Sequence, residues 1–507
     1  MSTATRRGIL VNPYLRMNNE MVEQIHRGSM ELLQNPGVEV WNEEAAALYD
    51  RGGAAVSRRG ENGAWWVKIP EKMVRDALEA APRRVVLGAR NPENALVLDG
   101  AEPRVFFGTG SETNFILTTR AEKFVSREDP SRERVFPLHG KKRGTLEDLC
   151  RAARLGEQLE HLDFFIRPVN IQDDDITEHN KDVNKFFACL DNMTKHVMAG
   201  LTELEQMDNV VHMAEIVAGS AGELRRNPVI SFITCLTKSP LQLVDDATRK
   251  MLAAVERGLP VVLSSSPQGG SSAPVAEAGM VVQINAEILA AVVLSQLARP
   301  GAPVIYGSVP VRARMDNLHD MYGAPEFNQY NVDCVQMARY YGLPVYSTGG
   351  VADAKVPGIQ AAVEKFFSHL YVTMSGPHLL HYAFGLLEET QTFCFEQAVL
   401  DNEHIGMVKT VMEAPEIDPE TINDNLEVIR KVMQSPHRLF ARYARKRIHS
   451  GRLYMGYPFE GGEEYDETML RAMEATEQLL AKPAPRLPEE VRQRVFDEVP
   501  GILDRLK

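Results

Sequence analysis

The chain has 507 residues, of which 44% are apolar and 25% are charged, a composition typical of a large globular protein. Its formal net charge of −13 argues against nucleic acids and anionic membrane surfaces as partners, because both require a basic face. The five widely spaced cysteines include no C-x-x-C pair, which favours a reducing cytoplasm over a disulfide framework.

The first 100 residues predict an N-terminal cap of mixed α and β structure. Apolar residues recur there with helical spacing, and strong stop signals such as Asn35-Pro36-Gly37 follow them. The predicted elements are helices over 21–33, 42–51 and 70–80 and a strand over 65–69.

Eight short apolar runs follow, mostly 30 to 40 residues apart. This distance accommodates one strand, one crossover helix and two loops. Eight such units predict an α/β fold, a closed (β/α)8 TIM barrel over residues 101–430. The runs begin at residues 105, 163, 196, 229, 261, 304, 345 and 379.

Amphipathic stretches between the runs predict the barrel helices. Thr145 and Asp148 have the spacing of a capping box at the start of the first. The predicted helices cover 145–159, 177–191, 203–219, 243–257, 276–298, 325–341 and 357–374.

The remaining chain, 431–507, predicts a helical C-terminal extension, since a bare barrel needs only about 250 residues. No apolar stretch suggests a membrane segment, because the longest one, 288–297, is too short to span a bilayer. We therefore expect a cytoplasmic protein.

A barrel of this type places its active site at the C-terminal ends of its strands. Aromatic rings occur there, namely Phe107, Tyr306, Tyr346 and Tyr382. Rings at strand ends are commonly core residues, and they also suit a cation–π cage for a quaternary ammonium group.

Other kinds of site have weaker signals at these strand ends. The glycines in Thr348-Gly349-Gly350 could approach a phosphate, or could simply leave room for a large ligand. The pair His378-x-x-His381 gives little support for a metal, because neighbouring strand residues need not direct both rings together. No local signature of a nucleophilic triad is present.

Four segments resemble the trimethylamine methyltransferase family, and the similarity extends over about residues 10–480. Members of that family are TIM barrels that pass a methyl group from an amine to the cobalt of a separate corrinoid protein. The sequence has no pyrrolysine, so it resembles the non-pyrrolysine branch, which includes glycine betaine methyltransferase. The segments are 303–308 (Pro-Val-Ile-Tyr-Gly-Ser), 323–327 (Gly-Ala-Pro-Glu-Phe), 338–344 (Ala-Arg-Tyr-Tyr-Gly-Leu-Pro) and 353–357 (Asp-Ala-Lys-Val-Pro).

The resemblance implies a methyltransferase that acts on a quaternary amine similar to glycine betaine. It implies a corrinoid supplied by a partner protein, no tightly bound cofactor and no resident metal, and it leaves homo-oligomerisation open. We expect Phe107, Tyr306 and Tyr346 to surround the ammonium group and Glu112 to add negative charge.

A carboxylate on the substrate would pair with Arg167 or Arg312. Arg312 is preferred because it follows the Tyr-Gly-Ser of the sixth run. His381 is a weaker candidate. Two other interpretations stay open: another TIM-barrel enzyme, such as a zinc-dependent methyltransferase or a decarboxylase, and a barrel that binds a quaternary amine without catalysis.

Overall fold

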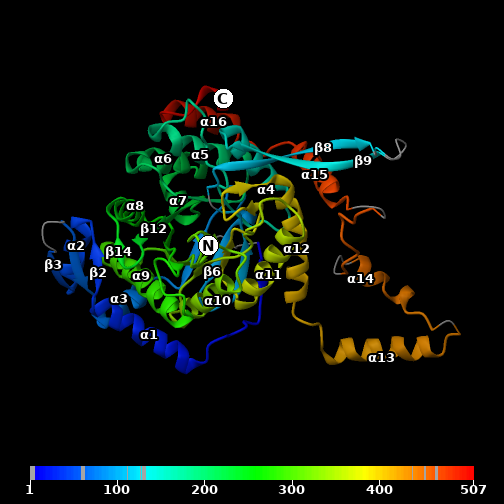
Figure 1. Ribbon diagram of the computed structural model, residues 1–507, viewed down its shortest axis with the longest axis horizontal. Coiled ribbons are helices and arrows are strands. Elements are labelled where there is room, and N and C mark those ends of the chain that lie inside the picture. The colour runs from blue at the N-terminus through cyan, green and yellow to red at the C-terminus, as the bar shows by residue number, and fades with distance from the viewer. Residues whose placement is uncertain are drawn as a thin grey trace.

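The fold is organised around a curled, mostly parallel sheet of nine strands (Figure 1). The computed structural model describes residues 6–58, 63–110, 112–125, 127, 133–436, 438–449, 453–462 and 466–507. In sheet order the strands are β1 (Ile9–Leu10), β7 (Arg104–Phe107), β21 (Leu379–His381), β20 (Val345–Thr348), β17 (Val304–Ser308), β15 (Val261–Ser265), β12 (Ile230–Cys235), β11 (His196–Ala199) and β10 (Phe164–Ile166).

Each of the eight predicted apolar runs overlaps one of these strands, and β1 is an added antiparallel strand at the edge. The other eight pair in parallel from β7 to β10. The two ends of this series also touch. Gly108 forms a parallel bridge with Phe164, and the Asp163 amide donates to the Phe107 carbonyl at 2.7 Å.

Helices connect consecutive strands, and their bounds lie close to the predicted ones. The capping box predicted at Thr145 and Asp148 is present. The connecting helices are α4 (Leu146–Gln158), α5 (Glu178–Asn192), α6 (Met207–Ala218), α7 (Ala221–Arg226), α8 (Asp245–Glu256), α9 (Glu277–Ala298), α10 (Pro325–Tyr340) and α11 (Ile359–Ser375), and α12 (Phe395–Met412) follows the last strand.

Helix α9 is largely enclosed by the rest of the fold. Among the described residues it is the single helix whose length and hydropathy would allow it to cross a membrane, yet 83% of the relevant stretch is buried within the fold. The N-terminal helices α1 (Asn19–Gln34), α2 (Glu43–Gly52) and α3 (Glu71–Ala80) pack on it. Its continuous apolar surface is therefore covered by other parts of the chain.

The N-terminal region is tied to the main sheet through the loop that follows β12. In that loop β14 (Gln242–Leu243) pairs in parallel with β2 (Val38–Val40). The same small sheet contains β13 (Thr237–Lys238), β3 (Ala55–Arg58) and β4 (Trp65–Lys68), and β4 is the strand expected at 65–69.

A short hairpin closes one end of the space inside the curled sheet. It consists of β5 (Arg84–Leu87) and β6 (Leu96–Asp99). Its buried side chains Val85, Leu87 and Leu96 share one apolar cluster with Phe106 and the other inward side chains of the parallel strands. These hairpin residues therefore act as a plug, and the sequence pattern did not predict it.

Two further parts of the chain project from the body (Figure 1). One is a long hairpin of β8 (Phe115–Val125) and β9 (Glu133–Arg143). The other, called the arm below, covers residues 413–449 and contains α13 (Pro419–Met433) and α14 (Arg445–His449). The chain then returns through α15 (Thr468–Leu480) and ends in α16 (Glu489–Glu498) and a short 3-10 turn.

Candidate active site

The carboxyl ends of the parallel strands form the open end of the curled sheet. Along β12 the side chains change from buried at Phe232 to partly exposed at Ile233 and Thr234 and exposed at Cys235. Because β12 lies between β11 and β15, solvent reaches Cys235 at the carboxyl end of the sheet. The opposite end is occupied by the β5–β6 plug, so a ligand would enter here.

Small residues leave space at this opening. Gly200 follows β11 and lies two residues after Met198, so both positions face the same side of the strand. Met198 belongs to the apolar cluster inside the curled sheet, which is called the inner cluster below. A Cβ atom at Gly200 would meet only the Ile233 carbonyl oxygen at 3.4 Å and Nη2 of Arg167 at 3.9 Å. This part of the opening is therefore not filled by packed side chains.

Three aromatic rings, called the aromatic wall below, lie together on β20, on β21 and directly after β21, and Tyr346 and His381 among them are buried. The rings of Tyr346 and His381 stack with centroids 3.9 Å apart and planes 19° apart. Tyr382 lies next to them, with its ring centroid 4.0 Å from that of His381. Tyr346 belongs to the inner cluster and Tyr382 packs against it. Adjacent strands β20 and β21 thus bring these rings together.

The imidazole of His381 is neutral at physiological pH. Burial lowers its pKa well below the ordinary value of 6.5. Nε2 lies 2.7 Å from Oγ1 of Thr348, which in turn donates to the Ser308 carbonyl at 3.2 Å. We assign the ring proton to Nε2 for this reason. Nδ1, which is buried without a partner, then keeps its lone pair.

A charged group lies at the carboxyl ends of β7 and β10. Nη1 of Arg167 is 2.5 Å from Oε2 of Glu112, and Nζ of Lys181 is 3.6 Å from the other oxygen. Burial opposes ionisation of Glu112, but the nearby Arg167, Lys185 and Lys181 together hold its pKa below the ordinary value. Glu112 is therefore ionised and Arg167 is positioned by it.

Lys185 adds a second, deeply buried cation behind this pair. It pairs with Asp182 and donates to Oγ1 of Thr202 at 3.2 Å. Burial and the neighbouring Arg167 lower its pKa to about 8, although Asp182 and Glu112 act in the opposite direction. The net charge of this group therefore changes close to physiological pH.

The structure brings four of the seven predicted site residues into two groups at the opening. Tyr346 and His381 form the aromatic wall, and Glu112 and Arg167 form the charged pair. Ser111, which follows the first strand in the predicted opening, lies outside the described residues.

The other three lie elsewhere. Phe107 packs in the outer core, with Nζ of Lys409 5.2 Å from its ring centroid. Tyr306 also faces outward and donates to Oδ1 of Asn285 on α9 at 3.0 Å. Each directly follows a residue whose side chain faces inward, Phe106 or Ile305, and therefore faces the opposite side of the sheet.

Arg312 belongs to a small separate sheet in the loops and lies against the start of α10. It is on β18 (Val311–Ala313), which pairs with β16 (Gln268–Gly269) and β19 (Asp320–Met321). Its guanidinium contacts Sδ of Met321 at 3.1 Å and lies 3.7 Å from Glu326. The expected preference for Arg312 over Arg167 therefore has no support from its position.

Several residues of the opening were not selected from the sequence as site residues. Cys235, exposed at the end of β12, has its sulfur 3.1 Å from Oγ of Ser264. Thr348 fixes His381, and Lys185 comes from the middle of α5. The position of Cys235 and Ser264 at or near the ends of apolar runs could have indicated them, whereas no local signal distinguishes Lys185 from a surface lysine.

One group of side chains in the described part of the chain has the composition of a metal site. His369, Asp401 and His404 are buried with potential ligand atoms within 4.8 Å of one another. The ammonium of Lys365 lies 3.1 Å from Asp401 and is itself fully buried. This cation already balances the carboxylate, and the group lies on α11 and α12 rather than among the inward residues of the sheet.

A curled parallel sheet with one plugged end and one open end offers a site for a small molecule at its open end. The family model described as trimethylamine methyltransferase (MTTB) matches residues 4–127 and 134–493. The chain belongs to this family.

Individual relatives agree with this assignment. Trimethylamine methyltransferase MttB of Desulfitobacterium hafniense (strain DSM 10664 / DCB-2) is 32% identical over 419 residues, covering 82% of this chain and 78% of that protein. The MttB protein of Methanosarcina thermophila is 32% identical, covering 82% and 81%. A glycine betaine methyltransferase of Desulfitobacterium hafniense (strain Y51) is 27% identical, covering 87% and 85%.

Proposed function

We propose that this protein is cytoplasmic and transfers a methyl group from a quaternary amine similar to glycine betaine to the Co(I) centre of a corrinoid carried by a separate protein. Family membership supports methyl transfer. The observation that carries the substrate class is the aromatic wall of Tyr346, His381 and Tyr382 at an open end of the sheet.

The proposal includes closure of the eight parallel strands into a (β/α)8 barrel. Support comes from the contacts between the first and last strands of the parallel series, which are the Gly108–Phe164 bridge and the hydrogen bond from Asp163 to Phe107. The Asp163 carboxylate also accepts from the Phe107 amide at 2.9 Å. A closed barrel would direct the inward side chains to one site at its carboxyl end.

The reaction suits a site without a general acid. When the methyl group passes to Co(I), the C–N bond breaks and the nitrogen keeps the electron pair, so a neutral tertiary amine leaves. The corrinoid of the partner protein supplies the nucleophile and accepts the methyl group. The residues of this chain have to bind the cation, orient one methyl group outward and exclude water.

The aromatic wall can bind the cation. Each ring face contributes about 0.5–2 kcal/mol to the binding of a tetra-alkylammonium group. His381 contributes only while it is neutral, because an imidazolium would repel the substrate. Its lowered pKa and its contact with Thr348 keep it neutral and fix its orientation.

The charged group can bind a carboxylate on the same substrate. Nη1 of Arg167 is engaged by Glu112, whereas Nη2 faces the space beside Gly200. A carboxylate placed there would accept a charge-assisted hydrogen bond from Nη2. Lys185 and Lys181 strengthen the positive potential around it.

Sequence identity alone does not select the amine, since the relatives named for trimethylamine are more similar than the one named for glycine betaine. The charged group favours a betaine, because trimethylamine carries no carboxylate that Arg167 could bind. The missing pyrrolysine, expected in the trimethylamine enzymes, favours the same choice.

The test is methyl transfer by the purified chain with glycine betaine, choline or trimethylamine, in the presence and absence of a reduced corrinoid protein. We expect transfer from glycine betaine that requires the corrinoid protein. Binding of the amine without transfer would indicate a binding protein. Turnover that needs no corrinoid but depends on zinc would indicate a zinc enzyme instead.

A further inference from the structure

The arm exposes an apolar stripe that nothing in the described chain covers. Ile422, Leu426, Ile429 and Met433 lie on one face of α13 at helical spacing and are 48%, 40%, 46% and 56% exposed. Figure 1 shows α13 away from the body, and it has no extended packing on any other described element. A 15-residue helix is only marginally stable alone in water, so this face needs a partner.

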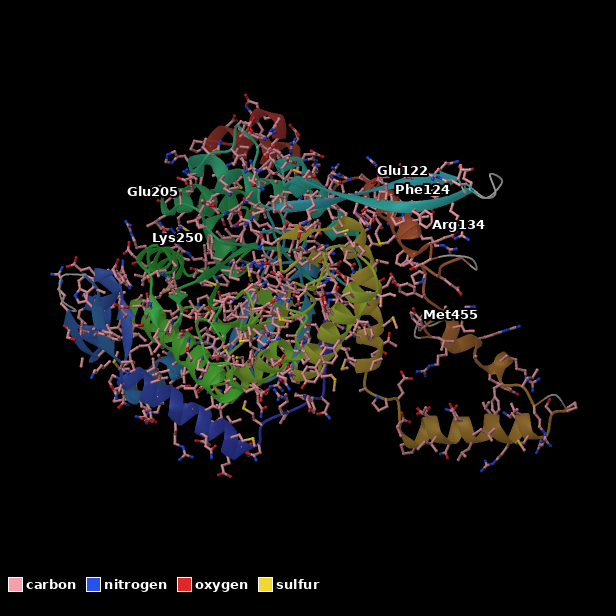
Figure 2. All side chains as sticks on the ribbon, viewed as in Figure 1. Glu122, Phe124, Arg134, Glu205, Lys250 and Met455 are labelled. Carbon is pink, nitrogen blue, oxygen red and sulfur yellow. The ribbon has the colours of Figure 1, made fainter. Side chains whose placement is uncertain are left out.

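The β8–β9 hairpin projects beyond the body in the same direction in Figure 1. Its described outer part exposes Phe124 and Val125 by 44% and 57%, and Phe124 packs edge to face on Phe136 at 5.6 Å. Figure 2 shows Phe124 on this hairpin and Met455 on the segment returning from the arm, both in the projecting part of the molecule. Exposed apolar side chains are thus concentrated on these projections.

The charges on α13 are divided between its two halves. Glu420 and Asp424 occupy the first half, Arg430 and Lys431 occupy the last turns, and the central Glu427 lies 3.6 Å from Lys431. If two such helices pair antiparallel about a two-fold axis near Leu426, the acidic half of each lies against the basic half of the other. The apolar stripes then face each other as well. A contact between identical subunits requires this kind of self-complementary surface.

We propose that α13 is a homotypic interface, on which the arm of a second copy of this chain packs antiparallel to bury both apolar stripes. The self-complementary charge pattern favours a second copy over a different protein, which would not need to repeat the pattern. The β8–β9 hairpins extend the contact by covering additional apolar surface of the second copy.

The first experiment is the solution mass of the full chain, measured by light scattering after size exclusion and by sedimentation equilibrium. We expect twice the mass of one chain or an even multiple of it. The variant Ile422→Glu with Ile429→Glu should reduce this mass by half or more, while circular dichroism stays unchanged. The control is Ile359→Glu with Val363→Glu on α11, which are 87% and 64% exposed but outside the arm and should leave the mass unchanged.

A charge exchange tests the antiparallel arrangement. Glu420→Lys with Asp424→Lys replaces the acidic charges of the first half by basic ones and should weaken the assembly. Adding Arg430→Glu with Lys431→Glu exchanges the charge signs of the two ends of the helix and should restore it. Restoration is not expected if the charges serve only the helix itself.

Three results would overturn the proposal. They are a single-chain mass for the unmodified protein, an unchanged mass for the Ile422 and Ile429 double variant, and an unchanged mass combined with loss of binding to a corrinoid protein. The last result would assign the stripe to that protein. Methyl transfer is measured separately, so a failed interface does not affect the proposed activity.

Discussion

Replacing Arg167 with alanine should separate the binding of a carboxylate from the binding of a quaternary ammonium group. The change removes the guanidinium whose Nη2 faces the space beside Gly200. Loss of a charge-assisted hydrogen bond costs about 1.5–3 kcal/mol. Because each 1.4 kcal/mol of binding free energy changes a dissociation constant tenfold, the KM for glycine betaine should rise by about 10- to 140-fold.

Choline has the same ammonium group without the carboxylate, so its KM should not rise. Glu112 would lose its closest cation and keep the nearby Lys185 and Lys181, the latter at 3.6 Å. Its carboxylate would then be freer to attract the choline cation, and the KM for choline would stay level or fall.

The assay is steady-state methyl transfer to a reduced corrinoid protein with both amines. Arg312→Ala is the matched control, because that guanidinium is engaged with Met321 and Glu326 and should affect neither substrate. Equal losses on both amines would show that Arg167 is only structural. A betaine-specific loss in the Arg312 variant would place the carboxylate in the loops instead.

Four further outcomes follow from the same geometry. Tyr346→Leu should lower kcat/KM about 2- to 30-fold per lost ring contact for betaine and choline alike, and a betaine-only loss in the kinetic assay would contradict the cation–π role. Lys185 loses its proton as pH rises through about 8, so betaine affinity should fall above that pH while choline affinity does not, and Lys185→Arg should remove the fall from pH–KM profiles. Gly200→Leu fills the opening and should abolish amine binding in thermal-shift titrations, with an unchanged melting temperature for the free protein as the check on folding. Chelator treatment followed by elemental analysis should leave methyl transfer unchanged, because the proposed reaction uses no resident metal, whereas loss of activity restored by zinc would favour the zinc enzyme.

The sequence was sufficient to locate the strands and connecting helices of the main sheet. Each strand, loop and helix unit is specified locally, by an apolar run, a break and an amphipathic stretch. The same local signals gave the capping box at Thr145 and the strand at 65–69. The resemblance carried by four segments also indicated the family to which the chain belongs.

The sequence did not show which face of each strand points inward. Parallel strands buried on both faces have apolar residues at every position, so they lack the alternation that marks an inner face. Phe106 and Phe107 are indistinguishable in the sequence, yet only the first faces the interior. For the same reason the sequence predicted both Tyr306 and Tyr346 as site residues, although only Tyr346 belongs to the aromatic wall.

The tertiary structure also decided how distant parts of the chain combine. The plug at 84–99 lies early in the sequence, yet it fills the end of a sheet whose strands continue to residue 381. Arg167 meets Glu112 and Lys185 because the ends of β7 and β10 and the helix α5 converge there. Contacts between side chains of distant segments cannot be predicted from the spacing of residues in the sequence, because they depend on strand order and register.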